Sequence, residues 1–445
     1  MMLFHFRKKI STSLEMLRIT RQTSKYSGII YPVKQSDKSP ETELSSLLPA
    51  SILKKLYTAG KPLQPGQSRI LYNEKIQQQE YEQVACVNVS LPKKMPKYEY
   101  VDTEKEHIRA AVSKAVKSFK GSNLDSVKID PSFFDLETVS EAVKLATFEY
   151  KTKEAKKYPK FTGLDGAGSI YGEAQNFARF LMEAPANLMT PQIFAETVQA
   201  KVKSWNLGDK VEVIVRDEAW IKSKNMGAFL SVSQGGGVPP VLLEVHVNKP
   251  KNDENAVPEI CMVGKGVTFD TGGISIKPSA GMDAMRADMG GAATMVSATL
   301  GAAKLDKSGK YYVCLTPLCE NMPSGSATKP GDVVTACNGK TIQVDNTDAE
   351  GRMILADTLV YADRDLKAKR IVDAATLTGA MMVALGAGAS GVFTRSQDIY
   401  DKLFDAAWHT GDRVWQMPMF NLYLEQMKKS PTRVGCTLSG IRFCI

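Results

Sequence analysis

The sequence predicts an α/β protein of two domains, a smaller N-terminal α/β domain and a larger C-terminal domain with a mostly parallel central sheet flanked by helices. The chain has 445 residues, which is too long for one ordinary hydrophobic core. In its second half, β-rich segments alternate with helical ones. That alternation indicates βαβ units and a parallel sheet covered on both faces.

The domain boundary is expected at Ala184-Pro-Ala-Asn187, which ends a helix predicted over 171–182. We expect a separate segment over 1–30, the N-terminal domain with a linker helix over 31–184, and the larger domain over 185–445. In the first domain, a strand is predicted over 84–91 and helices over 108–119 and 136–150. In the second, strands are predicted over 211–215, 240–247, 259–263, 311–316, 341–344 and 370–373, and helices over 284–303, 351–362 and 398–408.

The composition is that of a globular protein, with 43% hydrophobic and 24% charged residues. No apolar run reaches the roughly 18 residues of a membrane helix, so no membrane partner is expected. The net charge of +9 is concentrated in residues 1–30, which hold six Lys or Arg and one acid. Because the remainder is close to balanced for its length, no nucleic-acid partner is expected.

The first 30 residues have the pattern of a targeting segment. Leu3, Phe6, Ile10, Leu14 and Leu17 recur at helical spacing, and basic and hydroxyl residues fill the other positions. Such acid-poor amphipathic N-termini are typical of mitochondrial transit peptides. The alternative is a basic tail without targeting function, in which case a cytoplasmic location is expected.

Metal-binding histidine or cysteine motifs are absent from the sequence. The seven cysteines form no CxxC pair, and the four histidines lie far apart. The pattern suits free thiols in a reducing compartment. Any metal would therefore be held mainly by carboxylates.

The first motif that carries chemistry spans 263–277, VGKGVTFDTGGISIK, directly after a predicted strand. Its glycines allow sharp bends and close approach to a ligand, and they frame Asp270 between Lys265 and Lys277. The alternative is a glycine-rich phosphate loop. The segment matches neither phosphate-binding pattern, and an acid at the centre does not favour phosphate.

The second motif places Asp288 before Gly-Gly-Ala-Ala within a predicted helix, which suggests close packing with the acid directed inward. A lone helical Asp is more often at the surface or a cap. The third motif, DNTDAEGR over 345–352, lies between a predicted strand and a helix. Asp348 and Glu350 would diverge on a regular helix but can converge in the turn before it. The alternative is a capped helix start with a surface salt bridge to Arg352.

Together the three motifs offer four acids, Asp270, Asp288, Asp348 and Glu350. Converging carboxylates repel unless cations lie between them. Hard oxygen ligands without histidine or thiolate favour Mg²⁺, Mn²⁺ or Zn²⁺. Two metals that share carboxylates are a common means of activating a water molecule.

Five segments resemble the leucine aminopeptidases, also called cytosol aminopeptidases: GKGVTFDTGGISIK, MRADMGGAAT, LCENMPSG, KPGDVV and NGKTIQVDNTDAEGR. They occur in the family's order and spacing. The likeness is close over about 165–425 and loose in the N-terminal domain. NTDAEGR is highly specific, although Met353 follows it where the usual signature has Leu.

The resemblance implies two divalent ions per chain, Zn²⁺ or Mn²⁺. Asp270 and Glu350 would bridge them. Lys265 and Asp288 would complete the more loosely held site, and Asp348 the other. A lysine that binds a metal must be neutral, so a strongly depressed pKa is expected for Lys265.

The resemblance also implies the catalytic groups. Lys277 would stabilise the oxyanion, and Arg352 would seat a bicarbonate that acts as general base. The substrate pocket would include Met285, Thr376, Leu377 and Gly379.

The implied activity is that of a metal-dependent aminopeptidase that removes an N-terminal residue, Leu-like residues preferred, from peptides by means of a two-metal-activated water. A homohexamer is implied as well. Every metal and catalytic position is filled, which argues against an inactive relative. The alternatives are a catalytically impaired structural or assembly paralogue of the same fold and, more remotely, a nucleic-acid binder.

The likeness ends after about Met427, whereas family members continue for several dozen residues. Residues 428–445 show no helix or strand period. We therefore expect the catalytic domain, over 185–445, to be C-terminally incomplete and its solubility or turnover to be reduced.

Overall fold

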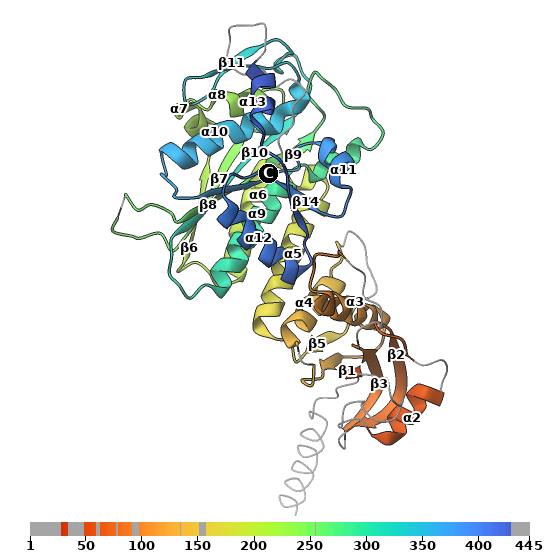
Figure 1. Cartoon of the computed structure of the whole chain (residues 1–445). Helices are drawn as coiled ribbons and strands as arrows, with labels where there is room; N and C mark the ends of the chain where they lie inside the picture. Colours follow the sequence, from red (N-terminus) through yellow and green to blue (C-terminus); the bar gives the residue numbers. More distant parts are fainter. Residues whose placement is uncertain are drawn as a thin grey trace, which may run out of the picture. The chain divides into compact units, whose positions relative to one another are not determined.

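The computed structural model divides the chain into two compact units (Figure 1). Residues 1–99 and 103–172 form the first unit, and residues 100–102 and 173–445 form the second. The N-terminal segment expected to carry the targeting pattern lies almost wholly outside the described residues, as do the C-terminal residues from 429. The structure describes residues 28–33, 49–58, 63–76, 79–90, 98–133, 135–150, 157–253 and 255–428.

The first unit contains a five-stranded sheet. Across the sheet the strands are β2 (Ser68–Ile76), β3 (Gln79–Asn88), β1 (Gly28–Val33), β4 (Ser126–Ile129) and β5 (Lys160–Thr162). β2 and β3 are antiparallel, and the other neighbours are parallel. The predicted strand over 84–91 is confirmed as β3. The predicted helices are confirmed as α3 (Thr103–Ser118) and α4 (Leu136–Ala146), which ends earlier than expected.

Strand β1 is apolar on both faces, because this sheet is covered on both sides. Ile30 packs into a core shared with α3 and α4. Ile29 and Tyr31 pack into a second core with Ile52 and Leu56 of α2 (Ala50–Thr58). Alternating side chains of one strand thus pack into two different cores. Neither β1 nor α2 is predicted from the sequence.

The second unit contains a six-stranded sheet in which β7 alone runs against the other strands. The order is β13 (Ile371–Ala374), β8 (Ile260–Gly264), β10 (Tyr312–Asn321), β7 (Val241–Val247) and β6 (Val211–Arg216), and β9 (Gly266–Asp270) also pairs with β10. The predicted parallel-rich sheet is confirmed. All the strands predicted in the second unit are present, but that over 341–344 pairs outside this sheet, and β10 is longer than expected.

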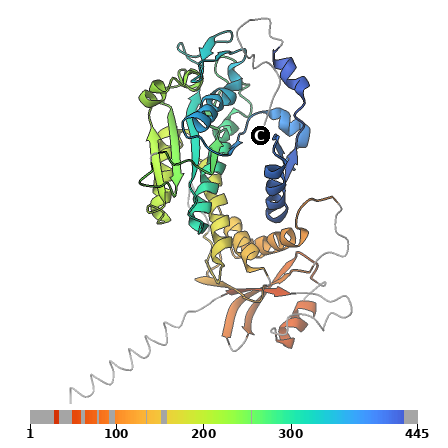
Figure 2. The same ribbon diagram turned by 60° about the vertical axis from the view of Figure 1, so that its left-hand side comes forward.

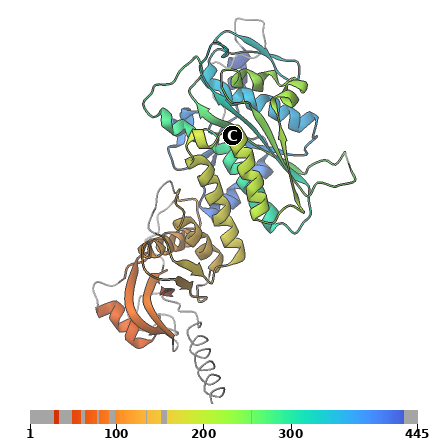
Figure 3. The ribbon, with the colours of Figure 1, turned by 180° about the vertical axis from the view of Figure 1, so that it is seen from behind.

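Helices cover both faces of this sheet (Figures 1 and 2). α8 (Gly227–Ser233) and α10 (Glu350–Arg364) pack on the face that carries Val263 and Leu315. α9 (Gly290–Leu305) packs on the other face, where Thr299 contacts Met262. The C-terminal ends of α6 (Pro191–Ser204) and α9 meet, where Lys304 donates a hydrogen bond to the carbonyl of Trp205 (Figure 3). Among the described helices, none is both long enough and apolar enough to cross a membrane.

Three local expectations are corrected. The helix predicted over 284–303 is broken into a 3₁₀ turn, η2 (Met282–Ala287), and α9, so Asp288 lies at the junction and not within a helix. Strand β12 (Thr341–Gln343) pairs with β11 (Val333–Thr335) in a separate ribbon, so the third motif does not follow a strand of the central sheet. Conversely, the glycine-rich first motif contains β9, because its residues 266–270 pair with β10.

Candidate metal and catalytic site

One cavity of about 1030 Å³ in the second unit brings together all the candidate residues. Its lining includes Lys265, Asp270, Lys277, Met285, Asp288, Asp348, Glu350, Arg352, Thr376, Leu377 and Gly379. The cavity lies where parallel strands of the sheet end, which is the usual binding edge of such sheets. Lys265 follows β8, Asp270 ends β9, and Thr376 follows β13.

Glycines allow these segments to approach one another. A Cβ on Gly291, at the start of α9, would lie 2.0 Å from the carbonyl oxygen of Ala374. A Cβ on Gly351, in the first turn of α10, would lie 2.7 Å from Cε of Lys265. Because the Ala374 carbonyl belongs to the backbone, α9 can reach the end of β13 only with glycine at 291; a side chain at 351 would instead displace the side chain of Lys265.

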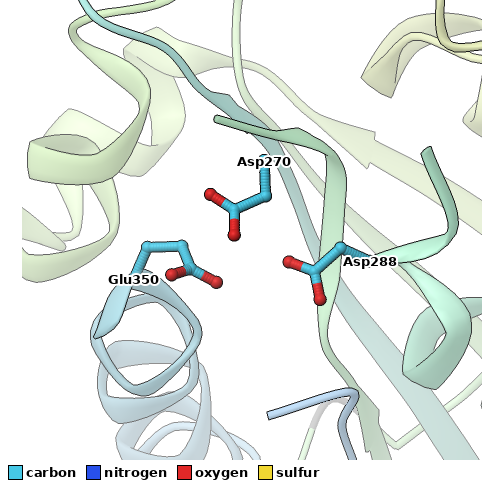
Figure 4. A group of neighbouring side chains, drawn as sticks. All are labelled: Asp270, Asp288 and Glu350. Carbon is cyan, nitrogen blue, oxygen red and sulfur yellow. The ribbon is translucent and has the colours of Figure 1, made fainter. Parts of the chain in front are cut away.

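Three buried acids form the centre of the site. One carboxylate oxygen from each of Asp270, Asp288 and Glu350 lies within 4.8 Å of the others. Figure 4 shows the three carboxylates directed toward a common point from β9, the η2–α9 junction and the start of α10. The structure thus brings together acids from all three sequence motifs.

Two lysines accompany the acids. The Nζ atom of Lys265 lies 2.8 Å from Oδ1 of Asp288 and 2.8 Å from Oε1 of Glu350, and it donates a hydrogen bond to the carbonyl of Thr376. Burial lowers the pKa of Lys265, but the two carboxylates outweigh burial and raise it above its usual range. The depressed pKa expected for Lys265 depends on bound metal ions, so it stays a prediction.

Lys277 occupies a different position. Its Nζ atom lies 2.8 Å from Oδ2 of Asp270 and forms an ion pair with Asp348. Burial opposes the charge, but hydrogen bonds to both acids raise the pKa of Lys277. Asp348 thus joins the site through Lys277 and does not belong to the close group of three acids.

The acids retain unused ligand atoms. Among the described residues, Oδ2 of Asp288 and Oε2 of Glu350 are buried without a hydrogen-bond partner. Such an atom costs about 1–3 kcal/mol unless something binds it. Burial raises the pKa of both carboxyl groups. Convergent carboxylates with spare oxygens fit a hard divalent cation, so the residues present suit the metals that the sequence indicates.

Two hydrogen bonds to the acids were not predicted from the sequence. The side-chain amide of Asn321, at the end of β10, donates to Oδ1 of Asp270 at 2.8 Å. Thr376, expected in the substrate pocket, also donates its hydroxyl to Oδ1 of Asp288 at 2.8 Å. Asn321 lies within LCENMPSG, one of the segments that resemble the family, but nothing local in the sequence shows that its amide meets Asp270. Other lining residues are Met182, Met381, Met382 and Asp412.

Fold and site together define a class: an α/β protein with a metal-suited centre of acids and lysines at the ends of parallel strands. Comparison with known proteins identifies the family. The sequence model of the cytosol aminopeptidase family, catalytic domain, matches residues 176–435. The cytosol aminopeptidase of Xenopus tropicalis is 46% identical over 423 residues, which cover 91% of this chain and 79% of that protein.

The cytosol aminopeptidase of Homo sapiens is 46% identical over 429 residues, covering 93% of this chain and 79% of that protein. A solved structure, the bottromycin maturation enzyme BotP in complex with Mn, has a similar fold, with a TM-score of 0.75 and 24% identity over 91% of this chain and 84% of that one. The chain therefore belongs to the cytosol aminopeptidase family and is, by family, an aminopeptidase.

Proposed function

We propose that this protein is a metal-dependent aminopeptidase that removes the N-terminal residue from peptides, with Leu-like residues preferred. The observation that carries the proposal is the buried group of Asp270, Asp288 and Glu350, two of which keep unpartnered oxygens. Lys277 stands beside this group, on the same cavity. Family membership supports the peptidase class.

The proposed cofactors are two divalent ions, Zn²⁺ or Mn²⁺. Asp270 and Glu350 would contact both ions, Lys265 and Asp288 one of them, and Asp348 the other. When bound, such ions supply an activated water and a Lewis acid. To serve as a ligand, Lys265 must release the proton that Asp288 and Glu350 now stabilise.

The remaining polar groups would act on the reacting peptide. Lys277 is about one-fifth exposed, whereas Lys265 is almost fully buried. Lys277 would therefore donate to the carbonyl oxygen as it gains negative charge. Arg352 lines the same cavity and would hold a bicarbonate that accepts a proton.

The apolar residues that line the cavity support the Leu-like preference. They include Met285, Leu377 and Gly379, together with Met182 and Met381. Methionine side chains adapt to varied apolar groups, so they suit an aliphatic substrate side chain. The cavity volume of about 1030 Å³ also leaves room for the peptide that follows the first residue.

The test is hydrolysis of a leucyl amide by the purified chain with Mn²⁺ or Zn²⁺, compared with the chelated protein. Metal analysis should find about two ions per chain, and Glu350→Gln should lose both metal and activity. An acetylated substrate, which lacks the free amine, should not be cleaved. Cleavage that persists after complete metal removal would contradict the proposal.

Two further proposals rest on sequence and family alone. We propose a homohexamer, which light scattering coupled to size exclusion would test against the mass of 48.7 kDa per chain. We also propose that residues 1–30 direct import into mitochondria, with a cytoplasmic location otherwise. A fluorescent reporter fused to residues 1–35 that remained in the cytosol would contradict this.

A further inference from the structure

The amide of Asn321 connects two segments that carry site residues. Its Nδ2 atom donates to Oδ1 of Asp270 at 2.8 Å and to the carbonyl of Thr347 at 3.1 Å. Asn321 is 4% exposed, so water does not compete freely for these bonds. One side chain at the end of β10 thus fixes the end of β9 and the turn that contains Asp348.

Thr347 ties the same turn to the segment between Asp270 and Lys277. Its hydroxyl donates to the carbonyl of Gly272 at 2.6 Å and accepts from the backbone N–H of Ser275 at 2.8 Å. Its own N–H donates to Oγ of Ser275 at 3.2 Å. Thr347 is buried.

We propose that Asn321 and Thr347 are positioning residues of the metal centre, which set the orientation of Asp270 and its distance from Asp348 and Lys277. The inference rests on the proposed function. One oxygen of Asp270, Oδ1, is held by Asn321 and by the N–H of Gly272 at 2.9 Å. The other oxygen, Oδ2, is thereby turned toward Lys277 and the cavity.

The physical basis is that a ligand held in one orientation loses little rotational freedom when a cation binds. Loss of partners that orient metal ligands typically reduces metal affinity or activity about 10–100-fold. Thr347→Val keeps the shape of the side chain but removes the two hydroxyl bonds, to the carbonyl of Gly272 and from the N–H of Ser275. Asn321→Leu removes both amide bonds at similar volume. Neither change removes a ligand of the proposed metals.

The experiment compares full-length variants by titration calorimetry with Mn²⁺ and by steady-state kinetics on a leucyl amide. The conservative variant Thr347→Ser retains the hydroxyl and should bind Mn²⁺ within about 3-fold of wild type. Thr316→Val is the matched control. Thr316 is buried on the same strand, β10, outside the cavity lining, and its hydroxyl has no partner among the described residues.

Asn321→Leu and Thr347→Val should each weaken Mn²⁺ binding by about 10–100-fold and lower kcat more than they change KM. Thr316→Val should leave both quantities unchanged. If Thr347→Val does not fold, Asn321→Leu decides the matter. Wild-type Mn²⁺ affinity in a folded Asn321→Leu protein would overturn this inference but not the proposed function. A wild-type protein that bound no Mn²⁺ and cleaved no leucyl amide would overturn the proposed function and this inference with it.

Discussion

Lys265 and Lys277 differ in burial although both pair with acids of the site. Lys265 is 2% exposed and enclosed by Asp288, Glu350 and the Thr376 carbonyl. Lys277 is more exposed and reaches the acids from the cavity. A group that meets the substrate only as charge develops lowers the barrier without strengthening ground-state binding. Lys277 suits that role by its position.

Replacement of Lys277 by Ala is therefore expected to lower kcat about 10²–10³-fold, with a smaller change in KM, because one oxyanion stabiliser is lost. Steady-state kinetics on a leucyl amide would measure both, with metal content determined on the same preparation. Lys402→Ala, an exposed lysine outside the cavity, is the control. A change in KM alone would show that Lys277 binds the ground state instead.

Metal binding is expected to depend on pH. Burial raises the pKa of Asp288 and Glu350, so these carboxyls retain protons at pH values where ordinary carboxyls have lost them. The pKa of Lys265 is also raised, and its proton must leave if it becomes a ligand. Since protons compete with the cation at all three groups, Mn²⁺ affinity should fall as the pH is lowered from about 8 to about 5.

Calorimetry in two buffers of different ionisation enthalpy would count the protons released when Mn²⁺ binds, and at least about one per chain is expected near neutral pH. The Asp288→Asn protein has no carboxyl proton at this position, so it should release fewer protons when Mn²⁺ binds. Binding that released no protons and did not vary with pH would mean that the acids are already ionised in the metal-free protein.

At the scale of secondary structure, local pattern predicted the central strands of the second unit but fewer than half of its described helices, with α6 and α8 among those missed. It did not predict β9, because the glycines of its segment conceal a pairing that only β10 provides. Nor did it predict the break before α9 that places Asp288 at a junction. The acids themselves were predictable, because their motifs are local in sequence. Asn321 was not, because its role depends on which strand ends meet.

Helix α10 carries both Glu350 and Arg352, and one buried acid holds it in place. Asp357 is fully buried, and its carboxylate accepts from the N–H of Phe229 at 2.9 Å and of Cys337 at 2.8 Å. Met226, which precedes α8, provides no side-chain cap, so Asp357 supplies one from a distant part of the sequence. The same carboxylate binds α10 to the ribbon of β11 and β12.

Asp357→Ala should lower the free energy of unfolding by about 2–6 kcal/mol, because it leaves two N–H groups without partners at about 1–3 kcal/mol each. Asp357→Asn should have a smaller effect, since its amide still offers one acceptor oxygen. Urea denaturation of each protein would measure the change. Asp363→Ala, at an exposed position of the same helix, should stay within about 0.5 kcal/mol of wild type.

At the scale of the whole molecule, the two units have separate cores and unequal shares of the site. The first unit is stabilised by two clusters around its own sheet. The second has a large cluster that combines its sheet with α8 and α10. Every candidate ligand and catalytic residue lies in the second unit. A cation that binds the folded site should therefore stabilise the second unit directly, and the first only if the two unfold together.

Hydrogen exchange would test this distribution. At a free Mn²⁺ concentration of about 100 times Kd, binding should stabilise the second unit by about 2.7 kcal/mol. Peptides from β8, β9 and α10 that exchange through global opening of that unit should then slow about 100-fold. Peptides from β1, β3 and α3 should keep their metal-free rates, because their cores contain none of the ligands. Glu350→Gln should abolish the difference. Equal slowing in both units would show instead that the chain unfolds as one cooperative body, in which the metal centre stabilises a sheet that contributes no ligand to it.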